Sequence, residues 1–147
     1  MGIRRSNNLG YVIDCRGAWL RPHARATTIQ LIVSGRVDAS NRDVVQTSLA
    51  RFIKLGESMI LDLEGADLEH SEATALLNGL AAECARQSVP HAAVLDPRTG
   101  RLLSRDAPLG FPLFRSVAEA VAHFGESTRV PEHSARVVPF PRKPFLA

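Results

Sequence analysis

The sequence predicts a single α/β domain in which a mixed β-sheet of about four to five strands is flanked by about three to four helices. Between residues 27 and 125, short β-branched segments alternate with segments whose apolar residues recur at helical spacing. The connections between the later strands are long enough to hold a helix, as parallel strands require. A chain of 147 residues accommodates one such domain with two extensions. We expect an extension at 1–10, the domain at 11–125 and a tail at 126–147.

Two strands are expected before the first helix. The first covers about residues 11–20, and Gly17 weakens it enough that it can form two short pieces. The connection to the next strand is expected at 21–23. Residues 27–33 are β-branched and apolar, as in a buried strand, and Ser34-Gly35 is expected to end it.

The first helix is expected to start at Ser40, which is a suitable N-cap residue with Asp43 three positions later. The helix should end near Gly56. Its apolar face repeats with helical spacing: Val45, Leu49, Phe52 and Ile53. Residues 59–63 form the next expected strand, closed by Glu64-Gly65.

The second helix carries the clearest amphipathic pattern in the chain. Ser71 is expected to be its N-cap, and Glu72 in the first turn is favoured by the helix dipole. Pro90 limits its far end. Its apolar face comprises Ala73, Leu76, Leu77, Leu80, Ala81 and Cys84. Without further information, capping and the dipole account for Ser71 and Glu72, with no functional role.

The last third of the domain is expected to hold shorter elements. A strand at 91–95 precedes one or two helical turns within 98–110, and a very short strand is expected at 111–114. Ser116 and Glu119 form a capping box that opens a final helix. Beyond Gly125 the helical periodicity is lost, and four prolines among basic residues predict an extended tail.

Charge and composition exclude several classes of function. The net charge is +3, but residues 27–125 carry nine basic and twelve acidic residues, so the domain body is acidic and no nucleic-acid partner is expected. No apolar run approaches the roughly 20 residues that cross a bilayer, so no stable membrane insertion is expected. The only cysteines, Cys15 and Cys84, form no paired motif, which favours the reducing cytoplasm.

No catalytic site, cofactor or metal is expected. The sequence contains neither a Gly-x-Gly-x-x-Gly dinucleotide motif nor a Gly-x4-Gly-Lys-Ser/Thr phosphate loop. His70 and Ser71 are adjacent, but no Gly-x-Ser-x-Gly elbow surrounds them. The histidines show no metal-ligand spacing: His23, His70, His91, His123 and His133.

Two segments resemble the signature motifs of STAS domains, the anti-sigma-factor-antagonist family. Residues 61–77 run as a Leu-Asp-Leu strand, a short loop and a helix start, where the family has Asp-Ser-Ser-Gly. Residues 33–40 resemble the family's Gly-x-x-Asp-Ala turn before its first helix. The resemblance covers about residues 10–125, including the order of the elements. It therefore identifies the predicted domain as STAS-like.

The resemblance implies a non-catalytic module that binds an anti-sigma factor, commonly a serine kinase of the ATPase fold, and so regulates transcription, as in a stress response. In such proteins phosphorylation of the first serine of the motif abolishes binding. Ser71 takes this phospho-acceptor position, and Asp38 takes that of the loop aspartate. These positions predict a partner-binding surface, called here the docking surface: Asp38, Ser40, Glu69, His70, Ser71, Glu72 and Thr74.

The motif departs from the family pattern at three positions. His70 replaces Asp, Glu72 replaces the second Ser, and Ala73 replaces Gly. A phosphate on Ser71 adds about −1.5 to −2 charges, but Asp67, Glu69 and Glu72 already make the region negative. We therefore hypothesise that Glu72 supplies a partly fixed charge and that the phospho-switch is weakened or lost.

Other interpretations stay open at this stage. A STAS-like chain can be an accessory subunit of a membrane transport system, and an enzyme with a site assembled from loops is a third alternative. The sequence also leaves open whether the chain forms a homodimer. In the tail, residues 137–145 either dock on another protein through their phenylalanines or are a solvated end.

Overall fold

The computed structural model describes residues 11–25, 27–106 and 110–129, which contain six strands and four helices. Three strands come first, and strands and helices then alternate. The strands are β1 (Ile13–Asp14), β2 (Ala18–Ala24), β3 (Thr28–Val37), β4 (Ser58–Leu68), β5 (His91–Val94) and β6 (Leu113–Phe114). The helices are α1 (Arg42–Ile53), α2 (His70–Gln87), α3 (Pro97–Asp106) and α4 (Val117–Arg129). The predicted fold class is confirmed, with slightly more strands than expected because β1 and β6 are only two residues each.

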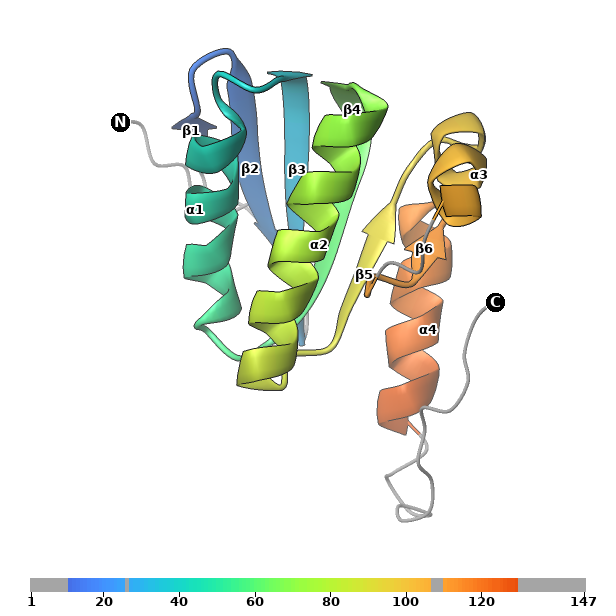
Figure 1. Cartoon of the computed structure of the whole chain (residues 1–147). Helices are drawn as coiled ribbons and strands as arrows, with labels where there is room; N and C mark the ends of the chain where they lie inside the picture. Colours follow the sequence, from blue (N-terminus) through green and yellow to red (C-terminus); the bar gives the residue numbers. More distant parts are fainter. Residues whose placement is uncertain (1–10, 26, 107–109, 130–147) are drawn as a thin grey trace.

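The six strands form one mixed sheet in sequence order, with β1 and β6 as its outer strands (Figure 1). β1, β2 and β3 pair antiparallel, whereas β3, β4, β5 and β6 pair parallel. Parallel strands end at the same edge of a sheet, so the loops that follow β3 to β6 all leave from one edge. In open α/β sheets this edge is the usual location of binding sites.

Helices cover both faces of the sheet. The apolar stripes of α1 and α2 pack on one face against Leu31, Leu61 and Leu63, in a cluster that also includes Leu103 of α3. α4 packs on the opposite face in a smaller cluster with Ile60, Ala92 and Val94. The predicted stripes are therefore confirmed: all six α2 residues from Ala73 to Cys84 named above are buried. In α1, Phe52 is only half-buried.

The N-terminal segment is a hairpin whose second strand is longer than expected. Arg16 and Gly17 have φ angles of 59° and 103° and form the turn between β1 and β2. The sequence placed the next connection at 21–23, which is wrong, because β2 continues to Ala24. Pro22 is tolerated there because β1 pairs only with Trp19 and Leu20, so the backbone nitrogen of Pro22 lies beyond the end of β1.

The expected break at Ser34-Gly35 is also wrong, because β3 continues to Val37. The register against β4 shifts between Ile32 and Ser34, so a bulge interrupts the ladder without ending the strand. Gly35 has a φ of 87°, and a Cβ built on it would lie 2.5 Å from the carbonyl oxygen of Gly17. The glycine that the sequence marked as a breaker instead allows β2 and β3 to approach closely.

The later elements lie where they were predicted, but β4 and α3 are longer than expected. β4 runs past the expected closing Glu64-Gly65 to Leu68, and α3 occupies three turns of the segment that was expected to hold one or two. The capping box is formed in part: Ser116 Oγ accepts a hydrogen bond from the Glu119 amide at 3.1 Å. The Glu119 carboxylate accepts a hydrogen bond from the backbone amide of Arg115. In a complete capping box it would accept from the amide of Ser116. α4 continues to Arg129, so the expected end of helical structure at Gly125 is wrong. The division into 1–10, 11–125 and 126–147 stays a prediction, since residues 1–10 and 130–147, with the tail motif, lie outside the described residues.

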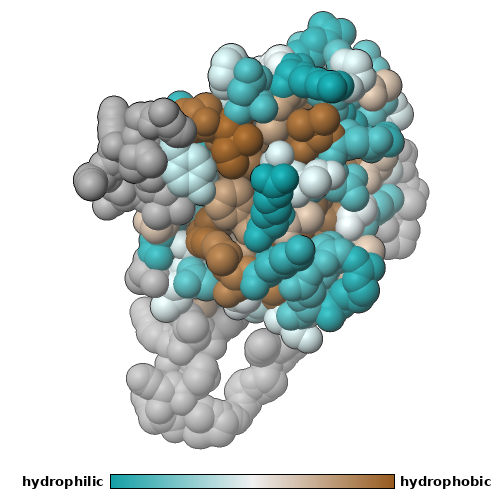
Figure 2. Space-filling model, turned by 90° about the vertical axis from the view of Figure 1, so that its left-hand side faces the viewer, coloured by the Kyte–Doolittle hydropathy of each residue, from teal (hydrophilic) through white to brown (hydrophobic). Residues whose placement is uncertain are grey.

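The surface seen from the side of β1 and α1 is mixed. Figure 2 shows apolar residues in brown grouped between hydrophilic residues in teal, without one continuous apolar face on that side. Large apolar side chains that are exposed include Val12, Trp19 and Leu55. Within the described part of the chain, no helix is both long and apolar enough to cross a membrane.

Candidate partner-binding site

The two segments of the docking surface lie side by side because β3 and β4 are parallel neighbours. Val37, the last residue of β3, pairs with Leu68, the last residue of β4. Asp38 and Glu69 immediately follow these paired ends. The structure therefore brings together the loop before α1 and the start of α2, which are about 30 residues apart in sequence.

The loop before α1 is held by a buried asparagine that the sequence analysis did not identify. Asn41 is only 2% exposed, and its side-chain oxygen accepts a hydrogen bond from Asp38 N at 2.9 Å. Its side-chain nitrogen donates to the carbonyl oxygens of Arg16 and Arg36, each at 2.9 Å. The N-cap residue of α1 is Asn41, so the assignment of Ser40 as the helix N-cap was wrong.

Ser40 instead stabilises the charge of Asp38. The hydroxyl and the backbone amide of Ser40 both donate to Asp38 Oδ1, at 2.5 and 3.0 Å. Arg36 Nε lies 3.5 Å from the other carboxylate oxygen. The Ser40 hydroxyl is the largest cause that lowers the pKa of Asp38 below its ordinary value of 3.8. The loop thus presents a well-ordered carboxylate that stays ionised at neutral pH.

α2 begins two residues earlier than the sequence predicted. Its N-cap residue is Glu69, whose side chain makes no capping hydrogen bond, so the assignment of Ser71 as N-cap was wrong. Glu69, His70 and Ser71 are all exposed at this end of the helix. Thr74 Oγ1 donates to the carbonyl oxygen of His70 at 3.0 Å. The Ser71 hydroxyl is therefore accessible in the first turn of a helix whose amides are uncapped by a side chain, a setting that favours an anion.

An ion pair joins the two segments. Arg42 Nη1 in the first turn of α1 lies 3.1 Å from Glu72 Oε1 in the first turn of α2. The Glu72 side chain is 14% exposed and that of Arg42 is 33% exposed. Glu72 therefore faces α1, and the charge that we expected it to add to the surface is largely neutralised by Arg42.

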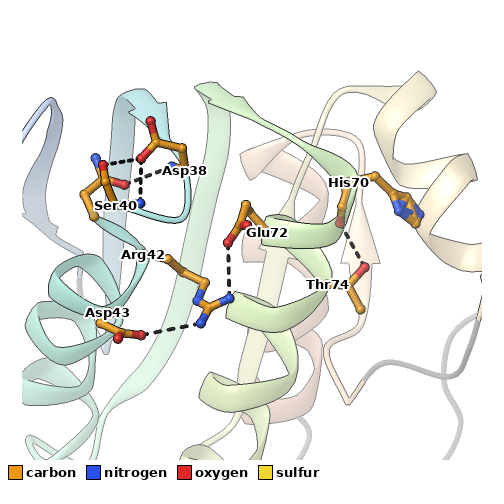
Figure 3. A network of polar contacts seen from close by, with 8 residues as sticks. Asp38, Ser40, Arg42, Asp43, His70, Glu72 and Thr74 are labelled. Carbon is orange, nitrogen blue, oxygen red and sulfur yellow. Dashed lines mark hydrogen bonds and ion pairs between the residues drawn. The ribbon is translucent and has the colours of Figure 1, made fainter.

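The docking surface is divided by α2. Figure 3 shows Asp38 and Ser40 in the loop above the start of α1, and Arg42 and Glu72 between α1 and α2. His70 and Thr74 lie on the other side of α2, toward α3. Sequence reasoning missed Arg42, because an arginine at a helix start matches no motif. The tolerance of asparagine at N-caps was the one signal that pointed to Asn41.

More carboxylates follow the same edge. Glu64 and Asp67 in the last part of β4 and Asp96 after β5 are exposed. Desolvation, together with the charges of Asp62 and Asp96, raises the pKa of Glu64 above its ordinary value. Among the residues that the structure describes, no group of three His, Cys, Asp or Glu side chains is arranged to hold a metal ion.

Comparisons with known proteins place this fold. The sequence matches no protein-family model and no curated protein. Solved structures do match. An anti-sigma factor antagonist from Mycobacterium paratuberculosis superimposes with a TM-score of 0.58 and 17% identity, covering 71% of this chain and 92% of that one. The anti-sigma factor antagonist SpoIIAA in its unphosphorylated form superimposes with a TM-score of 0.56 and 15% identity, covering 73% of this chain and 96% of that one.

The chain therefore has the STAS fold of these anti-sigma factor antagonists. The resemblance that the two sequence motifs indicated is confirmed at the level of the fold. At 15–17% identity the likeness concerns architecture, and what the surface binds is a separate question.

Proposed function

We propose that this protein is an anti-sigma-factor antagonist-like module that acts in the cytoplasm by binding, not by catalysis. Its partner is an anti-sigma factor, a serine kinase of the ATPase fold, and the contact is made through the docking surface around Asp38 and Ser71. The fold shared with two anti-sigma factor antagonists supports this proposal.

The observation that carries the proposal is the juxtaposition of the Asp38 loop and the exposed start of α2. The paired strand ends Val37 and Leu68 and the ion pair between Arg42 and Glu72 hold these segments together before any partner binds. A preformed surface loses little conformational entropy on binding. Its exposed carboxylates favour a partner surface that carries basic residues.

Ser71 is the proposed phospho-acceptor of this surface. Its hydroxyl is exposed in the first turn of α2, where a kinase can reach it and where the helix dipole tolerates the added negative charge. The nearest cation at the start of α1, Arg42, already pairs with Glu72. A phosphate at Ser71 is therefore added beside the exposed Asp67 and Glu69 while Arg42 is already paired, and we keep the hypothesis that the switch is weaker than in the family pattern.

Calorimetry with purified anti-sigma factors of the source organism tests the binding proposal. The wild-type chain is expected to bind one of them, and Asp38→Ala is expected to weaken binding by about tenfold, the usual effect of losing a hydrogen-bonded charge at an interface. Glu57→Ala is the matched control, because Glu57 is an exposed carboxylate that precedes β4 at the opposite edge of the sheet. Equal losses for both variants, or binding to none of the anti-sigma factors, would contradict the proposal.

The phosphorylation hypothesis needs its own experiment. The bound kinase and ATP are expected to modify the wild-type chain and not Ser71→Ala, as judged by intact mass. Phosphorylation of the wild type should weaken binding less than it does in Glu72→Ser, which restores the serine of the family pattern and frees Arg42. Phosphorylation that weakens binding as much in the wild type as in Glu72→Ser would refute a weakened switch.

A further inference from the structure

A cavity of about 390 Å³ opens at the same edge of the sheet, beside β5 and β6 and apart from the docking surface. Leu95 and Arg115 follow the paired strand ends Val94 and Phe114, and Leu95 N donates to the Phe114 carbonyl oxygen at 3.2 Å. Arg101 of α3 also lines the cavity. Its walls thus come from a strand pair and from α3.

The cavity carries more positive than negative charge. Arg101 and Arg115 both line it and are exposed, and neither forms an ion pair with a carboxylate whose side chain the structure describes. The one lining carboxylate, Asp96, accepts a hydrogen bond from Thr99 N at 3.2 Å, and its pKa is lowered mainly by a hydrogen bond from the Thr99 side chain. Asp96 is therefore engaged by the start of α3, whereas both guanidinium groups can receive an anion.

The rest of the wall is apolar. Leu95 is 2% exposed, and Leu113 and Phe114 are half-buried beside it. Leu113 packs with Leu95 and Leu103 on the α3 side of the sheet. The Phe114 ring packs on His123 of α4 on the opposite face, with 5.2 Å between the ring centres. The volume lies within the range of small-molecule sites, about 300–1,000 Å³, and exceeds what an inorganic anion alone would fill.

We propose that this cavity binds a small organic anion, a carboxylate or phosphate ester that carries an apolar ring or short chain. Arg101 and Arg115 contact the anionic group, and Leu113, on the α3 side of the sheet, contacts the apolar part. The site does not depend on the proposed anti-sigma-factor binding, because it uses no residue of the docking surface.

NMR titration of the ¹⁵N-labelled full chain with benzoate, phenyl phosphate and benzyl alcohol tests the proposal. At least one of the two anions is expected to shift the amide signals of Gly100 and Arg115 saturably, with a Kd on the order of millimolar for a ligand of this size. Whichever anion binds more tightly identifies the preferred acid group. Benzyl alcohol, which has the ring without the charge, should bind about tenfold more weakly.

Variants separate a built site from general surface charge. The double variant Arg101→Gln/Arg115→Gln is expected to weaken binding of the anion by about tenfold or more. Arg98→Gln is the matched control, since Arg98 is exposed on α3 but does not line the cavity. Gly100→Leu should also block binding, because Gly100 lines the cavity, an added Cβ meets no atom within 4 Å and leucine favours the helix.

Three results would overturn the proposal: no saturable shift with either anion, equal affinity for benzyl alcohol, or an equal loss in Arg98→Gln. Since no protein partner is present in this titration, its failure would leave the anti-sigma-factor proposal unaffected.

Discussion

Arg42 and Glu72 connect the first turns of α1 and α2 across a distance of 3.1 Å. This contact ties the loop that carries Asp38 to the helix that carries Ser71. Glu72 occupies the position where the STAS motif has its second serine, so the substitution exchanges a small hydroxyl for an interhelical ion pair. The local charge is thereby directed into the protein instead of toward a partner.

The Arg42–Glu72 pair should stabilise the domain measurably. A double-mutant cycle of Arg42→Ala and Glu72→Ala in urea is expected to give a coupling free energy of about 1 kcal/mol, because the pair is hydrogen-bonded and partly shielded from water. The control cycle uses Asp43, whose side chain is 90% exposed and lies 3.6 Å from Arg42. Its coupling should be near zero, and equal coupling in the two cycles would contradict the assignment.

The Asp38 loop should lose stability in acid. The folded-state pKa of Asp38 is lowered below 3.8, so its contribution is present above the unfolded pKa and is lost as the pH falls through the lower folded pKa. The hydrogen bond from the Ser40 hydroxyl is the largest cause of the lowered pKa of Asp38. Ser40→Ala removes this hydroxyl and should raise the pKa of Asp38 toward 3.8 in a carboxyl ¹³C NMR titration.

Asp96 provides the reciprocal control for that titration. Its pKa is also lowered, mainly through the Thr99 side chain, so Thr99→Val should raise the pKa of Asp96 and leave that of Asp38 in place. If Ser40→Ala moved both carboxyl groups, the effect would be one of overall stability and not of the local hydrogen bond.

Cys84 should be unreactive in the folded protein. Its side chain is fully buried in α2, and burial raises its pKa from 9.0 to about 11, which lowers the thiolate fraction at pH 8 about a hundredfold. In a Cys15→Ala variant, the remaining thiol should react with Ellman's reagent only as fast as the protein opens, and at once in urea. Rapid labelling of the native variant at pH 8 would show that α2 does not seal this position.

The sequence predicted best those elements whose buried residues recur at one regular spacing along the chain. The six-residue stripe of α2 is buried as expected because every third or fourth position meets the sheet. The ends of elements were predicted less well. Ser40 and Ser71 are both residue types that commonly cap helices. At the start of α1, however, the Asn41 side chain contacts three backbone groups of the loop. Local sequence propensity does not predict such tertiary contacts.

The two segments of the candidate site could be named from the sequence, but Asn41, Arg42 and the arrangement of the side chains could not. Sequence motifs placed Asp38 and Ser71 at the ends of strands, and parallel pairing then brought them to one edge. His70 and Glu72 lie on opposite sides of α2 because residues two apart are about 200° apart around a helix axis. That Glu72 meets Arg42 depends on how α1 and α2 pack against each other (Figure 3). No spacing in the sequence encodes that packing.

A series of three glycine substitutions should separate close approach from backbone strain. Gly35→Ala is expected to destabilise the domain by about 2–4 kcal/mol in urea denaturation, because its φ is 87° and the added Cβ would lie 2.5 Å from the Gly17 carbonyl oxygen. Gly56 has a φ of 80° but open space around it, so Gly56→Ala should cost about 1 kcal/mol from the backbone alone.

Gly100 completes the series. It lies within α3, shows no positive φ, and an added Cβ there meets no atom within 4 Å, so Gly100→Ala should stabilise the protein by about 0.5–1 kcal/mol through helix propensity. The order of the three free energies is the test. If Gly35→Ala were no worse than Gly56→Ala, Gly35 would not lie as close to the Gly17 carbonyl oxygen as the structure has it, and the path of β3 toward Asp38 would have to be redrawn.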